Sequence, residues 1–566
     1  MGIRKTVALM ISTLYGEYFY GVVKGARMAA DEKKINLMII PGGVLGKDRA
    51  DNVLYHLATQ GSVDAIACIT GAIVTDDAGY ELFRAESKDK PTLLIADKYE
   101  GFASIYYDNT SGVRQVMDYL INEKDCRRIL MFAGPELSGD SEERLAEYRR
   151  CMELNHLRLE DRMIERGDHT PYCIEAARKL IEANPGADAV VCSNDSQAQA
   201  MYRVLKDMDI EIGKDIYVTG FDDIGESAYM DPPLASVRAS SIKLGYETIT
   251  LAGRMGEGEQ SDGKVMACTF IKRASAGFDP NRTIAAFEDR RNVSVTTEFD
   301  IPSLTSAIVE FIFTGDVHDY QAECQKKLIE DFFYRLMNTY LGNVMRRSSG
   351  KQLEYTLSIF DRGGTEYIDS DRLFRILDNI YRIFCEKHKS DASRMELVSI
   401  IASIKRRVAD NLEKRTGNIR KIVTSQHKSL TKFSDRLLAI DPESEHRYRE
   451  LMEALPLIGV INASIFMYEE PIEQTDEMFR MPEKLYLKAY RDRTGAHEVD
   501  DAHQLTDTSD IMDYRYLEGG MNHTFFTMSL HYGRQQLGIM LIDLEDEFYS
   551  SYTLINNEIS MAVSHF

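Results

Sequence analysis

Short apolar runs alternate with amphipathic stretches over roughly the first 280 residues of the chain. The runs have the length and composition of strands covered on both faces, and the stretches between them carry apolar residues at helical spacing. The predicted strands are 6–12, 37–41, 65–70 and 92–96. The predicted helices are 17–33 and 47–60. This alternation predicts an α/β fold built on a parallel sheet with right-handed crossovers.

The stretch 188–224 continues the same pattern and adds polar residues at two strand ends. An apolar run precedes Ser193 and Asn194, a helical stretch covers 196–208, and a second apolar run ends at Asp222. Ligands of open α/β sheets bind beyond the carboxyl ends of strands, so Asn194 and Asp222 are candidate ligand contacts. The alternative is that Asn194 and Asp195 only cap the following helix.

Four motifs in this region occur in the order and spacing of one known family. They are YDNTSGVRQVMDYLI at 107–121, CRRILMFAG at 126–134, ERLAEYRR at 143–150, and SNDSQAQA at 193–200 followed by IGKDIYVTGFDDI. Together they resemble the effector-binding core of the lactose/purine-repressor family, which has the type I periplasmic-binding-protein fold. The resemblance covers residues 4–279 and implies two lobes with a ligand between them, the second lobe starting near Tyr107.

The resemblance also implies a set of ligand-binding residues on loops between the lobes. These candidates are Tyr15, Tyr18, Phe19, Thr70, Asp97, Arg144, Asn194 and Asp222. The aromatic residues suit stacking on a sugar ring or a base, and a guanidinium suits paired hydrogen bonds to ligand oxygens. Two alternatives stay open: Phe19 packs between helix and sheet, or Arg144 pairs with a neighbouring glutamate. Glu147 departs from the family, where glycine is frequent, and is expected to crowd the site or bind a polar ligand group.

Composition limits the class of protein. The 566 residues allow three or four domains, and 90 acidic against 68 basic residues give a formal charge of −22, which disfavours phosphate backbones. The eight cysteines show no CxxC pair or metal-ligand spacing, which favours reduced thiols in a cytoplasm. Neither a signal peptide nor a membrane-spanning run is expected. The repressors' amino-terminal helix-turn-helix has no room before the first strand, so DNA binding from that end is not expected. No cofactor, metal site or catalytic constellation is predicted.

Residues 280–396 change character and predict a helical domain. Apolar residues recur three and four apart, as at Leu328, Phe332 and Leu336. The predicted helices are 304–313, 320–345, 352–360 and 371–388. The sequence RGGTEY at 362–367 is similar at first glance to the GGDEF signature of cyclic-dinucleotide synthases, but it lacks the Asp-Glu pair and is interpreted as a turn.

Residues 397–440 predict a single long helix whose apolar positions alternate three and four apart, with two slips to four-four spacing. Such stutters locally unwind a left-handed coiled coil, so we expect a parallel homodimer through this signalling helix. Its outer face is basic, from Lys405 to Lys432. A DNA-binding role for that face is an alternative to a solvated surface that offsets the acidic remainder.

Residues 441–566 predict a small α/β domain. The predicted strands are 463–468, 485–490, 524–531 and 537–544, with helices at 443–455 and 549–566. This order resembles a GAF/PAS-type sensor domain, without a motif that would name a ligand. Related signalling proteins commonly continue into an output domain after such a helix.

The sequence therefore predicts a cytoplasmic, ligand-sensing regulator of signalling or transcription rather than an enzyme. It would bind a small polar molecule, a sugar or nucleoside-like compound, between two lobes and relay their closure through a dimeric helix. One alternative is the regulatory half of a signalling enzyme whose catalytic domain lies beyond Phe566. The other alternative is a DNA-binding transcription factor.

Overall fold

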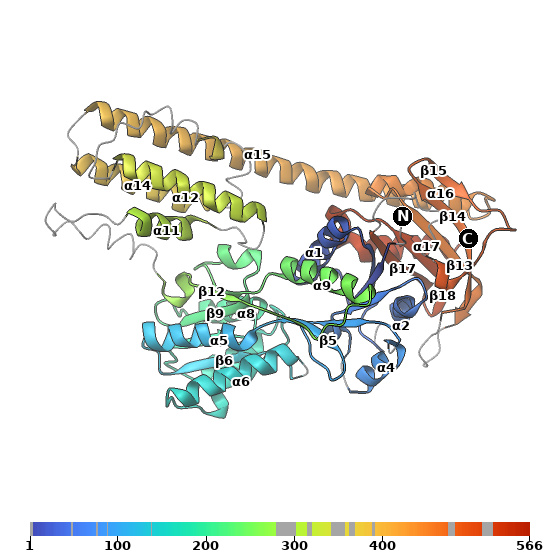
Figure 1. Cartoon of the computed structure of the whole chain (residues 1–566), viewed down its shortest axis with the longest axis horizontal. Helices are drawn as coiled ribbons and strands as arrows, with labels where there is room; N and C mark the ends of the chain where they lie inside the picture. Colours follow the sequence, from blue (N-terminus) through green and yellow to red (C-terminus); the bar gives the residue numbers. More distant parts are fainter. Residues whose placement is uncertain are drawn as a thin grey trace. The chain divides into compact units, whose positions relative to one another are not determined.

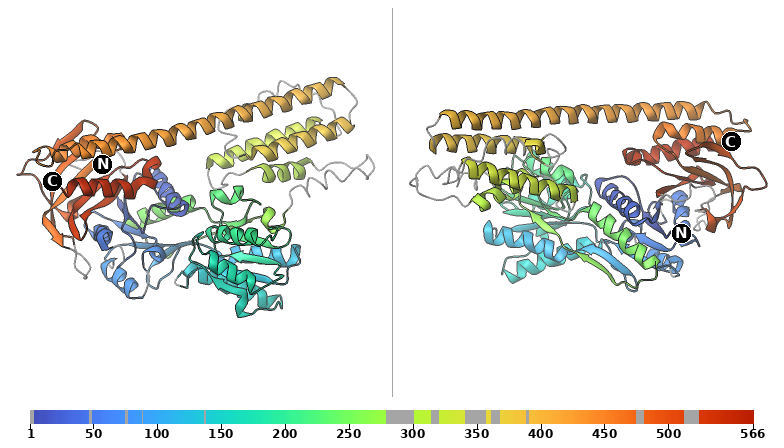
Figure 2. Two further views of the ribbon diagram at one scale, coloured as in Figure 1. Left: turned by 180° about the vertical axis from the view of Figure 1, so that it is seen from behind. Right: turned by 45° about the horizontal axis from the view of Figure 1, so that its top comes forward.

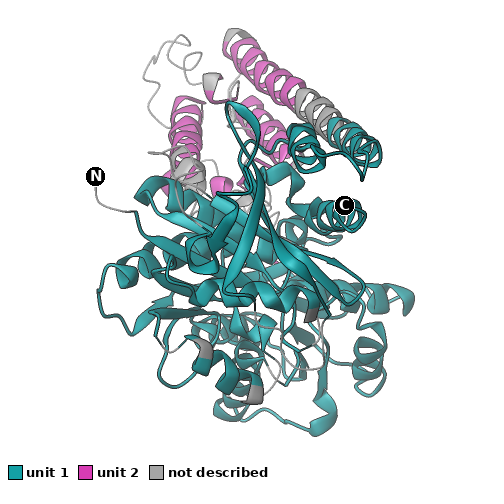
Figure 3. Ribbon diagram, turned by 90° about the vertical axis from the view of Figure 1, so that its right-hand side faces the viewer, with its two compact units in different colours: residues 1–277, 425–566 teal, residues 278–424 magenta. Residues whose placement is uncertain are grey.

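The structure is a computed structural model that describes most of the chain. The described residues are 4–46, 49–74, 77–87, 89–136, 138–278, 301–313, 320–340, 357–360, 368–387, 391–473, 481–511 and 524–566. The chain forms two compact units: unit 1 comprises residues 1–277 and 425–566, and unit 2 comprises residues 278–424 (Figure 3).

The first lobe of unit 1 is built on a parallel sheet with helices on both faces (Figure 1). Its strands, in spatial order, are β11 (Gly263–Met266), β5 (Ala103–Tyr107), β4 (Thr92–Ile95), β3 (Ala65–Cys68), β1 (Thr6–Ile11) and β2 (Asn36–Pro41). Alternate residues of β1 point to opposite faces. Leu9 packs against α1 (Glu17–Lys33) and α9 (Ser241–Gly256), while Met10 packs against η1 (Val53–Thr59) and α4 (Asp77–Ser87).

The second lobe is a separate, mostly parallel sheet (Figure 2). Its strands, in spatial order, are β12 (Thr269–Ile271), β10 (Ala235–Arg238), β9 (Tyr217–Asp222), β8 (Ala189–Cys192), β6 (Ile129–Ala133) and β7 (Ile164–Arg166). Its helices are α5 (Asn109–Asp118), α6 (Gly139–Leu154), α7 (Ile174–Glu182) and α8 (Asp195–Asp207). The chain crosses between the lobes three times, after β5, after β10 and after β11.

The two-lobed α/β architecture predicted for residues 4–279 is therefore present. The predicted strands and helices of this region occur within a few residues of their expected bounds. One difference is the predicted helix 47–60, whose described part is a short α2 (Arg49–Asn52) followed by the tighter turns of η1. The crossings lie side by side, because Tyr107 Oη donates to Ser240 O (3.0 Å) and Asp108 N to Met266 O (2.8 Å).

The carboxyl-terminal domain, residues 441–566, contains an antiparallel sheet with helices against it. The strands predicted at 463–468, 485–490, 524–531 and 537–544 are β13 (Ala463–Glu473), β14 (Lys484–Asp492), β17 (Thr524–Tyr532) and β18 (Gln535–Ile542). Two short strands were not expected, β15 (Gly495–Glu498) and β16 (Leu505–Asp507), and both pair with β14. The helices are α16 (Arg447–Ala454) and α17 (Tyr552–Val563). The resemblance to GAF/PAS domains stays a prediction.

The attachment of this domain to the first lobe was not predicted. Strand β17 pairs in parallel with β2, the edge strand of the first lobe, so that Thr524, Phe525 and Phe526 lie beside Leu37, Met38 and Ile39. The two sheets thus form one twelve-stranded sheet that continues from β11 through β2 and β17 to β15. An edge that an isolated first lobe would expose is covered by strand pairing.

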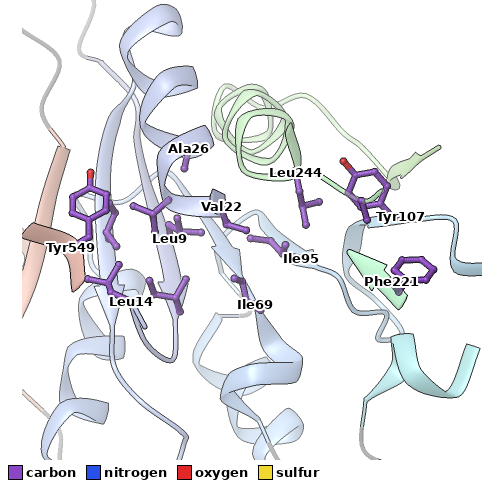
Figure 4. Packing of buried hydrophobic residues seen from close by; sticks show 14 of the residues in the cluster. Leu9, Leu14, Val22, Ala26, Ile69, Ile95, Tyr107, Phe221, Leu244 and Tyr549 are labelled. Carbon is purple, nitrogen blue, oxygen red and sulfur yellow. The ribbon is translucent and has the colours of Figure 1, made fainter. Parts of the chain in front are cut away.

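Side chains reinforce this joint on both faces of the shared sheet. Ser529 Oγ and Gln536 Nε2 both donate to Ala50 O, at 2.8 and 2.9 Å. Arg27 of α1 donates to Leu544 O (3.3 Å). Phe526 and Tyr549 belong to the same apolar core as Leu9 of the first lobe (Figure 4).

Unit 2 is helical, as predicted. Its described elements are α11 (Ile301–Ile312), α12 (Tyr320–Tyr340), η7 (Leu357–Phe360), α14 (Ser370–Lys387) and the first part of α15 (Asp391–Leu438). Phe332, Phe333 and Phe360 are fully buried at its centre. The turn predicted at 362–367 lies outside the described residues. Among the described helices, none has the length and apolar character needed to cross a membrane.

The long helix predicted at 397–440 exists as α15, but it is not a separate part of the chain. Leu397, Ile401 and Ile404 are buried in the core of unit 2. Phe433 and Leu437 are buried in the core of unit 1. Described residues at both ends of the expected dimer seam therefore pack within the chain itself. The residues just after the predicted boundary at 396 are buried in the core of unit 2, and those just before the predicted boundary at 440 are buried in the core of unit 1.

Replacing Phe526 with alanine tests the shared core. Phe526 is fully buried and its ring lies 4.9 Å from that of Tyr549. We expect the substitution to destabilise the protein by about 3–5 kcal/mol, the usual range for a buried Phe→Ala change. Because the first lobe and the carboxyl-terminal domain share the sheet and the core, urea should unfold both at the same lowered concentration. Hydrogen exchange of β1 and β13 amides would measure this.

The matched control is Leu554→Ala on the exposed side of α17, where 49% of the residue is accessible. It should change stability by less than about 0.5 kcal/mol. Unchanged stability of the first lobe in Phe526→Ala would show that the two parts fold independently.

Candidate ligand-binding site

The site is built where the carboxyl ends of strands from both lobes meet the start of α6. Strand β9 ends at Asp222, and α6 begins after Ser138, whose side chain caps the helix by accepting from Ser141 N (3.3 Å). The cap fixes the first turn of α6. We call five side chains the interlobe cluster. They are Tyr18, Asp97, Asp140, Arg144 and Asp222.

Arg144 is the centre of the interlobe cluster and is almost completely buried. Its Nε donates to Asn109 Oδ1 (2.9 Å) and its Nη1 to Ser193 O (2.7 Å). The guanidinium lies over the ring of Phe221, 3.6 Å from the centroid. Its Nη2 is left facing two carboxylates, Asp140 Oδ2 at 3.6 Å and Asp222 Oδ1 at 4.0 Å. Arg144 is therefore held rigidly with one donor group directed into the cluster.

Asp222 occupies an unusual backbone conformation, and its described ion-pair partner is Arg144. Its φ is 98°, a region that residues with a side chain rarely adopt and that is often found at binding sites. Its carboxylate accepts no hydrogen bond from any residue that the structure describes. Burial raises the pKa of Asp222 to about 6, with Asp140 adding to the rise and Arg144 opposing it. Apart from the long ion pair with Arg144, the acceptor sites of this carboxylate are therefore not used by the described residues.

The first lobe contributes Tyr18 from the first turn of α1. Burial raises the pKa of the Tyr18 hydroxyl, and the charges of Asp140 and Asp222 raise it further. The hydroxyl of Tyr18 therefore lies close enough to Asp140 and Asp222 for their negative charges to disfavour its ionisation. It donates to no group within the described residues. Tyr18 also contacts Phe19 edge to face, with ring centroids 5.5 Å apart.

Asp97 and Thr70 form the opposite wall on the first lobe. Thr70 Oγ1 donates to Asp97 Oδ2 (2.7 Å), and the Tyr80 hydroxyl donates to the same oxygen. The other oxygen of Asp97, Oδ1, faces Gly139 of the second lobe. A Cβ atom built on Gly139 would lie 3.5 Å from this oxygen. Beside it, Lys98 pairs with Glu143 across the two lobes. The lobes are therefore in contact at this rim.

Comparison with known proteins agrees with this arrangement. The family profile described as "Periplasmic binding protein-like domain" matches residues 117–276. The transcriptional repressor CytR of Escherichia coli K12 is 22% identical over 277 residues, covering 48% of this chain and 79% of CytR. The regulator CelR of Thermobifida fusca is 28% identical over 262 residues, covering 44% of this chain and 73% of CelR. A solved CelR–cellobiose complex aligns at 25% identity, covering 48% of this chain and 85% of that one, with a TM-score of 0.43.

Residues 117–276 match a periplasmic-binding-protein-like domain, and about half of the chain is similar to repressors of the LacI/GalR type. The similarity covers the two lobes, so it accounts for the interlobe cluster and not for unit 2 or the carboxyl-terminal domain.

The other predicted contacts of this LacI/GalR-type domain lie elsewhere. Tyr15 is 80% exposed, and its described hydrogen bond is local, from its backbone N to Thr13 Oγ1 (3.0 Å). Phe19 packs against the first-lobe core, as the alternative interpretation held. Asn194 caps α8, because its Oδ1 accepts from Gln197 N (2.9 Å) and its Nδ2 donates to His169 O (3.2 Å). These contacts use both ends of the Asn194 amide within the protein.

Glu147 does not reach the site. It is buried against α5 and pairs with Arg114 Nε (2.9 Å), so the expectation that it crowds the ligand is wrong. Asp195, expected only to cap a helix, is fully buried and accepts from Ser227 Oγ and Ser236 Oγ, each at 2.6 Å. It thereby fixes the loop that follows Asp222.

Sequence reasoning missed Asp140, Asn109 and Phe221. Asp140 precedes Arg144 by four residues, which places two opposite charges on one face of α6, and this spacing was available in the sequence. Asn109 donates to Asp140 Oδ1 (2.8 Å) while it accepts from Arg144, so it orients both. Burial raises the pKa of Asp140, and Glu143 and Asp97 raise it further.

Replacing Asp222 with asparagine tests the electrostatics of the interlobe cluster. Since the folded protein holds the pKa of Asp222 near 6 instead of its ordinary value of 3.8, it binds this proton more tightly than the unfolded chain does. Ionisation therefore costs stability as pH rises from about 4 to about 6. Asp222→Asn removes that cost, and at pH 7.5 it should stabilise the ligand-free protein by about 1–3 kcal/mol.

The measurement is urea unfolding of both proteins at pH 4 and pH 7.5. The stabilisation should be present at pH 7.5 and shrink toward pH 4, where Asp222 is already protonated. A variant that is less stable than the parent protein at pH 7.5 would mean that Asp222 has a stabilising partner.

Proposed function

We propose that this protein is a ligand-responsive regulator that binds a small polyhydroxy molecule at the interlobe cluster. The observation that carries the proposal is the Asp222 carboxylate, which has a positive φ and a raised pKa and pairs with Arg144 at 4.0 Å. Its side chain is 25% accessible, so a ligand can reach the acceptor sites that Arg144 does not use.

The polar groups of the cluster suit hydroxyl groups in particular. Arg144 Nη2 can only donate, the Asp222 carboxylate can only accept, and the Tyr18 hydroxyl can do both. A ligand hydroxyl both donates and accepts, so adjacent hydroxyls can bridge Arg144 and Asp222. This chemistry supports a sugar or nucleoside-like effector. Among the relatives is the ribose operon repressor of Escherichia coli, 24% identical over 242 residues.

The regulatory part of the proposal rests on the relatives, which are named as transcriptional repressors and regulators. A second candidate, direct DNA binding, is favoured by exposed basic residues of α15 in an otherwise acidic chain. Arg406, Lys428 and Lys432 are among them. A DNA mobility-shift assay titrated with salt would test it, since phosphate contacts weaken steeply as salt rises.

Binding is the first test of the proposal. A thermal-shift screen of sugars and nucleosides should find a stabilising compound. Asp222→Ala and Arg144→Ala should each weaken its binding by about 2–4 kcal/mol, because each leaves a ligand group or a buried charge without its partner. Isothermal titration calorimetry would measure the loss. Affinity should also fall as pH drops below about 6, where Asp222 becomes protonated.

Tyr15→Ala is the control, because Tyr15 is exposed and makes no described contact with the cluster. It should bind the same compound with unchanged affinity. A compound that binds equally well to Asp222→Ala and Arg144→Ala would place the site elsewhere.

We also propose that the protein forms a homodimer through the middle of α15. Because Leu397, Ile404 and Phe433 pack within the chain, we assign the partner helix to positions between Val408 and Leu430. Ile419→Asp combined with Ile422→Asp would place charges in that seam, where unpaired burial is strongly unfavourable.

Sedimentation velocity of the Ile419→Asp, Ile422→Asp variant should show a monomer where the parent protein shows a dimer. His427→Asp with Lys428→Asp is the matched control, since both residues are exposed, and it should stay dimeric. A dimeric Ile419→Asp, Ile422→Asp variant would assign the interface to another surface.

A further inference from the structure

Unit 2 is an insertion whose first end is fixed to the second lobe. The chain leaves unit 1 after Gly277 and enters unit 2 at Phe278. Ser275 Oγ donates to Val218 O (2.6 Å) and accepts from Ala235 N (2.8 Å). These bonds tie the exit of the chain to β9 and β10.

The helix α5 of the second lobe holds the same exit from another side. The Tyr119 hydroxyl, one residue past α5, donates to Ala276 O (3.2 Å), and Lys124 donates to Gly277 O. The last described residues before unit 2 therefore move with the second lobe.

The second end of unit 2 is fixed to the carboxyl-terminal domain. The last turns of α15 bury Phe433 and Leu437 in the unit 1 core. Ser434 Oγ donates to Glu558 Oε1 (2.8 Å) on α17, and Gln426 Nε2 donates to Glu547 O (2.9 Å). The end of α15 is thus held by both apolar and polar contacts.

The carboxyl-terminal domain, in turn, is part of the first lobe. The parallel pairing of β17 with β2 and the bonds of Ser529 and Gln536 to Ala50 O join them as one sheet. Arg27 adds a salt bridge to Asp546 (2.9 Å). A sheet with a shared core is stiff compared with the crossings that connect the two lobes.

We propose that unit 2 is a mechanical insertion whose two ends are carried by different lobes, so that the angle between the lobes sets the separation of its ends. When the lobes close, residue 278 moves with the second lobe, while the end of α15 stays with the first. The link on the first-lobe side is α15, a single helix that begins in unit 2 and ends in unit 1. That a ligand drives this closure rests on the proposed function, but the coupling itself does not.

The experiment moves the lobes without any ligand. Lys98→Cys with Glu143→Cys places two thiols at the rim where the lobes meet. A short, reducible bifunctional thiosulfonate reagent then locks the rim closed. In a second protein, Lys98→Glu sets a like charge against Glu143 and drives the rim apart. Single-cysteine variants treated with the same reagent control for reaction at native cysteines such as Cys173 and Cys385.

Hydrogen exchange is read at amides 301–313, 320–340 and 370–408 of unit 2. Between the locked and the Lys98→Glu proteins, we expect the slowest of these amides to differ by at least about threefold in rate. Reducing the crosslink should restore the exchange of the uncrosslinked protein. Protection at residues 139–147 reports that the rim itself differs between the two proteins. Equal exchange in unit 2 alongside that rim difference would overturn the proposal.

A flexible spacer shows whether the effect passes through the two ends. A Gly-Ser segment of about twelve residues inserted after Phe278 slackens one end and should abolish the difference in unit 2. The matched control inserts the same spacer between Gly533 and Arg534, in the exposed β17–β18 turn, and should leave the difference intact. A difference that survives the spacer after Phe278 would refute this route. Because no ligand is used, either failure leaves the ligand-binding proposal standing.

Discussion

The pairing of β17 with the edge of β2 is the interaction on which the arrangement of unit 1 depends. An uncovered edge strand offers a row of backbone N–H and C=O groups that can pair with another chain. Here residues almost 490 positions later in the sequence satisfy those groups. The pairing joins the first lobe and the carboxyl-terminal domain through one sheet, whereas the second lobe is joined to them by the three crossings and by side-chain contacts at the rim.

The two lobes also contribute different side chains to the interlobe cluster. The second lobe holds Arg144 rigidly through Asn109, Ser193 and the ring of Phe221. The first lobe presents Tyr18 to the same charges. Asp222 is held at a positive φ with a raised pKa, which costs stability when its carboxyl group is ionised. The cost is located where the lobes meet, so relief of it favours the state in which they stay together.

Local pattern in the sequence was enough to predict the strands and helices of both lobes, because each is long, strongly apolar and bounded by polar turns. It also offered the correct alternatives for Asn194 and Phe19, since capping and interface packing are local events. The choice between Tyr15 and Tyr18 depended on which side of the first turn of α1 faces the second lobe. Periodicity does not determine that direction.

Two features were out of reach for a physical reason. Strands β13, β17 and β18 are apolar on both faces, like any covered strand, and nothing in such a run names the strand beside which it will lie. In α15, Leu397, Ile401 and Phe433 fit a dimer seam and a chain's own core equally well, because both require apolar residues three and four apart. The sequence spacing identifies the buried side of that helix but not what buries it.

The late position of β17 also orders events during synthesis. A ribosome has completed β2 at Pro41, yet the strand that covers it starts at Thr524. At about 5–20 residues per second, the first lobe emerges with its edge open for roughly half a minute or more. Nascent chains on one messenger RNA lie close together. During this interval the uncovered edge of β2 can pair with a strand of a neighbouring nascent chain. The helices of unit 2, which rely on contacts close in sequence, can form during that interval. The strand that covers the edge of the first lobe is thus translated long after the lobe's own strands.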